Sequence, residues 1–272
     1  MKQLKFFMFA LTVLMGVSFT SCLDSDDSEY NSVGLFRVMT GYSGSYFMDL
    51  VGNQLYPTYS SVLEIEEQLG GPISAYDLAY IQYSYVEETT TRAESSTTPQ
   101  VYNIKLLGFV GYTATLTETI SSEEEVGDLS SNEVPFVSLT PSGSNGYGYN
   151  YTNYPATYGK LYLLAPIAFM TTNDEEKFKQ HSFHLAFIPA NVQSGDTELV
   201  FYMSHDAGSD DMSTSPVTTS GTKIFDIQSA LMNFQAKTGA YPKKITIKAK
   251  VNENSTTLPD EFTSVSIDCN FD

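Results

Sequence analysis

The sequence contains a serine and a lysine at a spacing that some enzymes use for acyl transfer. Residues 220–223 read SGTK, which matches the S-x-x-K pattern of penicillin-binding enzymes, and residues 237–239 read KTG, a second motif of those enzymes. Lys237 follows Lys223 by only 14 positions, and no S-D-N motif lies between them. In those enzymes the motifs lie far apart in a larger α/β domain. We therefore interpret the match as a coincidence and keep a hydrolase with Ser220 as its nucleophile as an alternative.

A polar stretch after a strand could supply oxygen ligands to a metal. The residues HDAGSDD bring His205, Asp206, Asp210 and Asp211 together at a strand end, and Ca²⁺ takes about six to eight oxygen ligands. The spacing differs from that of an EF-hand, so we interpret the stretch as a solvated turn. A calcium site at Asp206, Asp210 and Asp211 is the alternative, and no other metal and no cofactor is expected.

The two remaining histidines lie close together in the sequence but not in the same environment. His181 and His184 are three residues apart on an expected strand, so they point to opposite faces and cannot share a metal there. His181 is in phase with Phe183, which places it on a packed face. No His, Cys or Ser has an obvious base and orienting acid beside it, so we expect no enzymatic activity.

The strongest binding candidates are tyrosines in the stretch SGSNGYGYNYTNYPATYG. Gly and Asn alternate with the aromatic residues, which predicts a loop rather than a helix or strand. The candidate ligand-binding residues are Tyr147, Tyr149, Tyr151 and Tyr154. A tyrosine ring offers a flat apolar face and a polar tip, which suits sugars and protein partners. Packing of these rings between two domains is an equally open interpretation.

The elements that would position these residues are strands. The chain has 19 Tyr and 17 Phe but no Trp, and short segments rich in Thr, Ser, Val and Tyr lie between turn residues. Residues 33–136 contain five or six expected strands and one modest helix, which fits a small barrel such as an OB fold. Residues 137–158 form a Tyr/Gly-rich linker, and residues 159–272 contain six or seven strands that predict a β-sandwich. The expected fold class is therefore all-β.

The N-terminus has the features of a secretory signal. Lys2 and Lys5 give a positive start, residues 6–20 are apolar and uncharged, and Cys22 follows a small residue. The apolar run is shorter than the roughly 20 residues that span a bilayer. We assign residues 1–21 to a signal peptide.

The residues around Cys22 indicate a lipid anchor. The stretch FTSC resembles a bacterial lipoprotein box, although Phe19 and Ser21 replace the usual Leu and the usual Gly or Ala. Residues 22–32 form an acidic tether that resembles the export signal of surface-exposed lipoproteins. We expect an outer-membrane lipoprotein, exposed at the cell surface and held in the lipid by acylated Cys22. An ordinary signal peptide with an incidental Cys is the alternative.

The charge limits the range of partners. The formal net charge is −18, and the assigned signal peptide contributes two Lys and no acidic residue, so the rest of the chain is still more acidic. This opposes binding to nucleic acid. Once Cys22 is acylated, Cys269 has no second cysteine for an intramolecular disulfide.

The order of these features resembles the NigD-like family of Bacteroidetes lipoproteins. After the lipobox and acidic tail, SYFMDLVGNQLYPT is similar to that family's first strand pair, with Tyr56-Pro57 in place of Trp-Pro. IKLLGFVGYTATLTETI is similar to the strand that ends its first domain, LVFYMSHDAGSDD to its strand ending in His, and KIFDIQSAL with KKITIKAKVNE to a later pair. The resemblance spans nearly the whole chain. It implies an N-terminal OB-like barrel and a C-terminal immunoglobulin-like β-sandwich, without an established activity.

Together these observations predict a lipid-anchored, non-catalytic envelope protein that acts as a binding or interaction module. Its partner would be a glycan or an envelope protein. A structural or immunity-type partner of another envelope protein is a second hypothesis, and an envelope hydrolase is a third.

Overall fold

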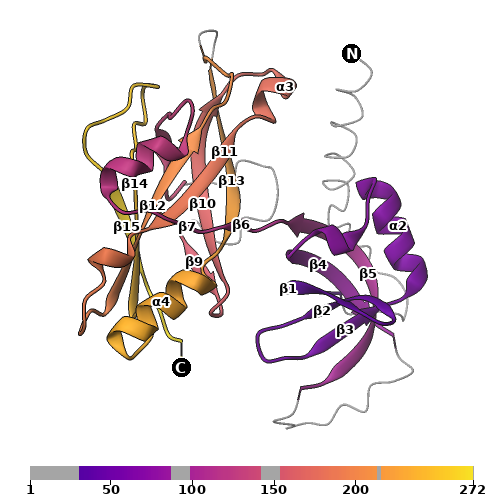
Figure 1. Ribbon diagram of the computed structural model, residues 1–272. Helices are drawn as coiled ribbons and strands as arrows, with labels where there is room; N and C mark the ends of the chain where they lie inside the picture. Colours follow the sequence, from indigo (N-terminus) through magenta and orange to yellow (C-terminus); the bar gives the residue numbers. More distant parts are fainter. Residues whose placement is uncertain (1–30, 87–98, 142–153, 213–215, 272) are drawn as a thin grey trace. The chain divides into compact units, whose positions relative to one another are not determined.

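The computed structural model describes residues 31–86, 99–141, 154–212 and 216–271 (Figure 1). Two compact units divide the chain between Thr113 and Ala114. Cys22, most of the predicted tether and most of the predicted linker lie outside the described residues. Within the described ranges, no helix is long and apolar enough to cross a membrane.

The first unit is a closed barrel with the strand order β1-β2-β3-β5-β4, in which β4 pairs again with β1. A helix joins the third strand to the fourth, and this is the arrangement of the OB fold that the sequence predicts. The elements are β1 (Asn31–Gly41), β2 (Gly44–Met48), β3 (Gln54–Pro57), α2 (Tyr59–Leu69), the 3-10 helix η1 (Ile73–Ala75), β4 (Leu78–Tyr85) and β5 (Val101–Tyr112).

Side chains along these strands point alternately inwards and outwards, and the inward ones are apolar and fill the barrel. Phe47 and Ile81 are fully buried, and their sequence neighbours point outwards or are less buried. Helix α2 packs on β5, where the Ser61 hydroxyl accepts a hydrogen bond from the Leu106 amide. The helix ends at Gly70, whose φ of 69° suits a residue without a β-carbon.

The second unit consists of two sheets that enclose one core. One sheet has the order β6-β13-β10-β8, with β9 also paired to β10, and the other has the order β15-β14-β12-β11-β7. The strands are β6 (Thr115–Leu116), β7 (Glu118–Thr119), β8 (Phe136–Ser138), β9 (Ala156–Tyr158), β10 (Tyr162–Thr171), β11 (Ser182–Phe187), β12 (Glu198–Asp206), β13 (Val217–Asp226), β14 (Lys244–Ala249) and β15 (Thr263–Asp268). The helices are η3 (Glu123–Leu129), α3 (Glu175–Phe178), η4 (Pro189–Asn191) and α4 (Gln228–Thr238).

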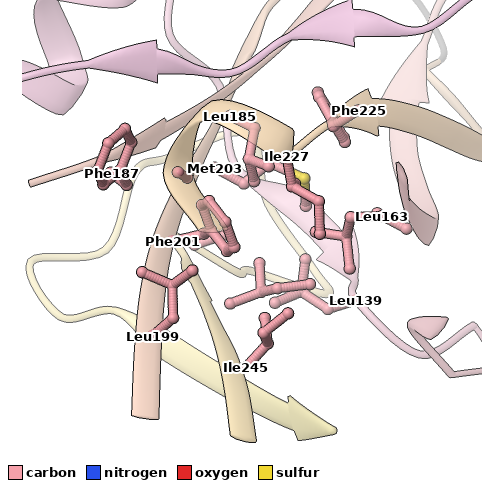
Figure 2. Close-up of a cluster of buried hydrophobic side chains, with 14 of the residues drawn as sticks. Leu139, Leu163, Leu185, Phe187, Leu199, Phe201, Met203, Phe225, Ile227 and Ile245 are labelled. Atoms are coloured by element: carbon pink, nitrogen blue, oxygen red, sulfur yellow. The ribbon is translucent and has the colours of Figure 1, made fainter. Parts of the chain in front are cut away.

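The core of this unit lies between the two sheets. Figure 2 shows that side chains from both sheets, among them Leu163 of β10 and Phe201 of β12, point into the same cluster. Phe225 and Phe234 are also buried there, so α4 contributes to the core as well. Burying a side chain of this size contributes roughly 1.5–3 kcal/mol to folding. The predicted all-β barrel and sandwich are confirmed.

The sandwich differs from an all-antiparallel one because the chain changes sheets between paired strands. Strand β12 pairs in parallel with β14, and β13 and α4 lie between them in the sequence. Short parallel strands also close two sheet edges, since β6 pairs with β13 and β7 with β11. Covered edges have fewer free backbone groups for unwanted pairing.

These short edge strands move the start of the second unit towards the N-terminus. The sequence predicts that the first domain extends to residue 136, whereas residues from Ala114 onwards cluster with the second unit. The physical reason is that β6, β7 and β8 pair with β13, β11 and β10. Strands of two or three residues have no periodicity from which this pairing could be predicted.

Candidate functional site

Of the tyrosines predicted to bind a ligand, one falls within the described part of the chain. Tyr147, Tyr149 and Tyr151 lie outside the described residues. Tyr154 precedes β9 and is 64% exposed. The binding role of this set therefore stays a prediction.

The three aspartates of the predicted calcium alternative point to different partners. Asp206, the last residue of β12, accepts hydrogen bonds from the backbone amides of Ser131, Asn132 and Gly208. Asp211 forms an ion pair with Lys177 at 3.3 Å. Asp210 points into the protein and its side chain is 0% exposed. No group of three or more His, Cys, Asp or Glu side chains in the described ranges could hold a metal.

Asp210 is the centre of a buried hydrogen-bond network. Its Oδ2 accepts bonds from the Thr172 amide at 2.9 Å and the Thr172 hydroxyl at 3.1 Å, and its Oδ1 accepts one from the Met212 amide at 3.1 Å. Burial alone would raise the pKa of Asp210, but these donors and His181 outweigh burial and lower the pKa to about 2. Asp210 is thus an anion at neutral pH.

Two histidines extend this network into the core. His181 Nε2 lies 3.2 Å from Asp210 Oδ2, and His181 Nδ1 lies 2.8 Å from His205 Nε2. Asp210 accepts from His181 Nε2–H, so in the neutral pair His205 Nε2–H donates to His181 Nδ1. His205 Nδ1 is then a buried acceptor, and it has no hydrogen bond of good geometry to any described residue.

The histidine pair is surrounded by aromatic rings. The His205 ring stacks on Phe183 with centroids 4.7 Å apart, and Phe169 meets it edge to face at 5.0 Å. Phe178 of α3 stacks on His181 at 6.3 Å. Burial lowers the pKa of His205 to about 3, with His181 and Lys223 acting in the same direction. The expectation that His181 lies on a packed face is confirmed, because its side chain is 1% exposed.

The serine and lysine of the SGTK motif do not form a catalytic pair. Both lie in β13, whose pairing with β10 is regular from Val217 to Asp226. Residues three apart on a strand point to opposite faces. Lys223 points into the core, where its ammonium lies 4.4 Å from the Phe183 ring centroid, so Ser220 points to the other face. Burial lowers the pKa of Lys223.

A serine, a histidine and a glutamate do meet on the outer face of β11. Ser182 Oγ lies 3.2 Å from His184 Nε2, and His184 Nδ1 lies 2.8 Å from Glu118 Oε1 on β7. These are the connections of a hydrolytic triad. However, Ser182 sits within a strand, and its cross-strand neighbour Asp206 would repel the oxyanion of an acyl-transfer step. We interpret the set as a brace that holds β7 against β11.

Tyrosines gather at one end of the barrel, where β4 ends and β5 begins. Tyr83, Tyr85 and Tyr102 form a row of edge-to-face contacts, with centroids 5.5 Å apart for the first pair and 5.4 Å for the second. Tyr83 is buried, and burial raises its pKa. Tyr85 is 41% exposed, so the row runs from the barrel core to the surface. We call these three residues the barrel-end tyrosines.

A second pair of tyrosines lies on the outer wall of the same barrel. Tyr46 of β2 and Tyr56 of β3 stack with centroids 4.9 Å apart and planes 14° apart. The Tyr56 hydroxyl donates to Gln54 Oε1 at 3.0 Å. Because each ring covers a face of the other, this pair offers less free ring surface than Tyr85 and serves the pairing of β2 with β3.

Sequence reasoning missed two of these arrangements. It placed His205 at the edge of a polar turn, whereas Phe201, Met203 and His205 alternate on one face of β12 and point into the core. That alternation is visible in the sequence and could have placed His205 inside. The contact between Glu118 and His184 depends on the pairing of β7 with β11, for which the sequence carries no signal.

No protein-family model matches the chain, and no curated protein matches it. Solved structures do match over most of its length. A candidate lipoprotein from Bacteroides fragilis NCTC 9343 is 24% identical with a TM-score of 0.62, and the match covers 89% of this chain and 98% of that chain. An uncharacterized protein from Parabacteroides merdae ATCC 43184 is 11% identical with a TM-score of 0.52, covering 87% and 98%.

A NigD-like immunity protein from Bacteroides caccae ATCC 43185 also matches, with 14% identity, a TM-score of 0.45, and coverage of 87% of this chain and 93% of that chain. What this chain shares with the two structures of higher TM-score is the fold.

Proposed function

We propose that this protein is a lipid-anchored envelope lipoprotein of the NigD-like kind that acts as a binding module without catalysis. The proposed location in the cell envelope rests on the sequence around Cys22, where a short apolar run ends in FTSC and an acidic segment follows. The fold shared with a candidate lipoprotein of Bacteroides fragilis supports this assignment. The ligand class that fits best is an uncharged oligosaccharide.

The observation that carries the binding proposal is the exposure and fixed orientation of Tyr85. Tyr85 is 41% exposed as a residue, and its ring makes edge-to-face contacts with both Tyr83 and Tyr102. A ring that is already fixed loses little side-chain entropy when a ligand binds. Sugar rings bind flat aromatic surfaces with a polar tip, and the net charge of −18 disfavours anionic ligands.

The geometry around the two candidate serines does not favour catalysis. Ser220 and Lys223 point to opposite faces of β13. Ser182 reaches His184 at 3.2 Å, but a carboxylate is its cross-strand neighbour. Neither serine therefore has both a base and a site that would stabilise an oxyanion.

The proposed lipid anchor and location are tested by comparing the wild type with Cys22→Ala. We expect the wild type to carry the mass of acyl chains, to sediment with the outer membrane and to be cut by protease added to whole cells. The Cys22→Ala chain should lose the acyl mass and the membrane association. A wild type that is acylated but protected from protease would place the protein on the periplasmic side, and an unmodified soluble wild type would contradict the anchor.

The binding role is tested with the same Cys22→Ala chain on an oligosaccharide array, followed by calorimetry of any hit. Tyr85→Ala should weaken binding by roughly tenfold or more, since a stacked aromatic anchor typically contributes over 1 kcal/mol. Tyr42→Ala is the matched control, because Tyr42 is a fully exposed barrel tyrosine at the turn between β1 and β2. Equal losses in both variants would contradict a site at Tyr85. Capture of one stoichiometric envelope protein without glycan binding would favour the partner hypothesis instead.

A further inference from the structure

The loop of residues 207–212, which follows β12, is anchored inside the protein by the buried carboxylate of Asp210, in addition to contacts such as those of the Asn132 side-chain amide with the carbonyls of Gly208 and Asp210. Asp210 within this loop accepts the Thr172 amide at 2.9 Å, which ties the loop to the end of β10. It also accepts the Met212 amide at 3.1 Å within the loop itself. Met212 has a φ of 49°, a left-handed conformation that costs a non-glycine residue energy and persists only where contacts hold it. The left-handed turn at Met212 and its attachment to β10 therefore depend on Asp210 staying in place.

Asp210 in turn depends on the two histidines behind it. His181 Nε2 lies 3.2 Å from Asp210 Oδ2, and His181 Nδ1 lies 2.8 Å from His205 Nε2. The side chains of Asp210 and His181 are 0% and 1% exposed, and His205 is 0% exposed as a residue. The three groups form one buried chain from the loop into the core. We call it the Asp–His–His chain.

The surroundings of His205 favour its neutral form. Lys223 of β13 lies against the same Phe183 ring on which His205 stacks, at 4.4 Å from the ring centroid, and its positive charge opposes a second cation nearby. Burial opposes protonation more strongly still. The groups that favour a proton are Asp206 on β12 and the carbonyl of Pro135, and their effect is smaller.

The other charged groups around the loop are paired outside the core. Asp206 is fixed by amides of residues 131, 132 and 208, Asp211 pairs with Lys177 at 3.3 Å, and Glu133 pairs with Lys250 at 3.2 Å. Hydrogen bonds to Asp206 outweigh its burial and lower its pKa, so Asp206 stays charged through mild acid. His205 is therefore the group whose burial makes the closed loop sensitive to protons between about pH 6.5 and pH 3.

We propose that the Asp–His–His chain is an acid-sensitive clasp that keeps the 207–212 loop closed at neutral pH and releases it in mild acid. Opening the loop admits water to His205, which then takes up a proton on Nδ1. The imidazolium cannot return to its buried position near the ammonium of Lys223 without losing that proton. Each unit of pH below the ordinary value for histidine should therefore raise the opening equilibrium constant about tenfold.

Amide hydrogen exchange on the full-length protein in detergent tests this proposal. The Thr172 and Met212 amides both donate to Asp210, so they exchange when the clasp opens. After correction for intrinsic exchange rates, we expect the opening constant of peptides that contain these amides to rise about tenfold per pH unit between pH 6 and pH 4. An opening constant that does not change with pH would overturn the proposal.

Two variants separate the clasp from general acid effects. His205→Gln keeps an N–H donor for His181 Nδ1 but cannot be protonated in this pH range. In this variant the opening constant should therefore rise by less than about threefold per pH unit. His184→Gln changes the half-buried histidine on the opposite face of β11 and should keep the wild-type rise. A His205→Gln variant that keeps the tenfold rise would contradict the role of His205.

A measurement on the wild type alone covers the case in which His205→Gln does not fold. Nuclear magnetic resonance of the histidine ring carbons should show His205 of the closed protein neutral down to about pH 4. Titration of this ring near pH 6.5 in the folded state would overturn the proposal. It would show that closure of the loop does not disfavour protonation of His205.

Discussion

Nδ1 of His181 and Nε2 of His205 lie 2.8 Å apart inside the second unit. Through these two imidazole rings, the end of β12 is connected to Asp210 in the loop that follows it. Such a contact requires that one ring donates and the other accepts, so it fixes the tautomers of both. The carboxylate of Asp210 sets the direction, since it accepts from the far nitrogen of His181. A buried polar chain of this kind is stable only while each member keeps its partner.

The first prediction concerns the pH dependence of folding. With the 207–212 loop closed, burial lowers the pKa of His205 to about 3, whereas the unfolded chain takes up this proton near pH 6.5. Acid therefore favours the unfolded state. The free energy of unfolding decreases for this reason as the pH falls from about 6.5 towards 3. Between pH 7 and pH 5 the free energy of unfolding should fall by about 2 kcal/mol more in the wild type than in His205→Gln, as measured by urea denaturation.

Asp210 of the Asp–His–His chain causes a second decrease in the free energy of unfolding, at lower pH. The pKa of Asp210 is lowered to about 2, so its contribution is present above about pH 3.8 and is lost as the pH falls towards 2. Equal pH dependence in the wild type and His205→Gln down to pH 5 would show that other groups dominate the acid response.

The second prediction compares two aspartates of one loop. Asp210→Asn removes the buried charge that accepts from Thr172, Met212 and His181, and should lower the free energy of unfolding by about 3 kcal/mol. Asp211→Asn removes an exposed ion pair with Lys177 and should cost less than about 1 kcal/mol. Urea denaturation at pH 7 measures both. Similar losses would mean that the buried network does not hold the loop.

Much of the fold follows from alternation in the sequence. Strand β14 alternates Ile245, Ile247 and Ala249 on the core face, and the structure buries all three. The helix α2 was harder to predict, because the stretch around Ile65 is short enough to suit a strand or a helical turn. Its apolar residues at Val62 and Ile65 pack on the barrel together. Tertiary packing, not local propensity, thus decides its full length.

The predicted sites were less complete than the fold because contacts between distant segments create them. The sequence brings Asp206, Asp210 and Asp211 together, yet the structure gives each a different partner. His181 and His205 are 24 residues apart and meet through the pairing of β11 with β12. The β12 periodicity shows which face His205 takes. Only the register shows that His181 faces it.

The third prediction tests the barrel core. Phe47 is 0% exposed inside the first unit, so Phe47→Ala should lower the stability of that unit by about 3–5 kcal/mol through lost burial and a cavity. Hydrogen exchange of peptides from β1 to β5 reports on this unit directly. Tyr42→Ala, at a fully exposed position of the same barrel, should leave their exchange unchanged. Unchanged exchange in Phe47→Ala would show that Phe47 does not support the barrel.

The fourth prediction concerns serine reactivity. A fluorophosphonate probe should label neither Ser182 nor Ser220 above the level of a denatured sample, because Asp206 lies beside the first and Lys223 points away from the second. Mass spectrometry of the labelled protein gives the site. Labelling of Ser182 that disappears in His184→Ala would instead show that the triad on β11 is active.

The fifth prediction concerns the thiol of Cys269. Burial raises its pKa to about 11, with the neighbouring charge of Asp268 adding to the effect, and the side chain packs against the core of the second unit. In a Cys22→Ala chain, Cys269 is the one remaining cysteine of the sequence. At pH 8, iodoacetamide should modify it on the order of 100-fold more slowly in the folded protein than in urea, since the thiolate is the reactive form. Asp268→Asn should speed the folded-state reaction only slightly. Equal rates in buffer and in urea would show that the end of β15 does not shield the thiol.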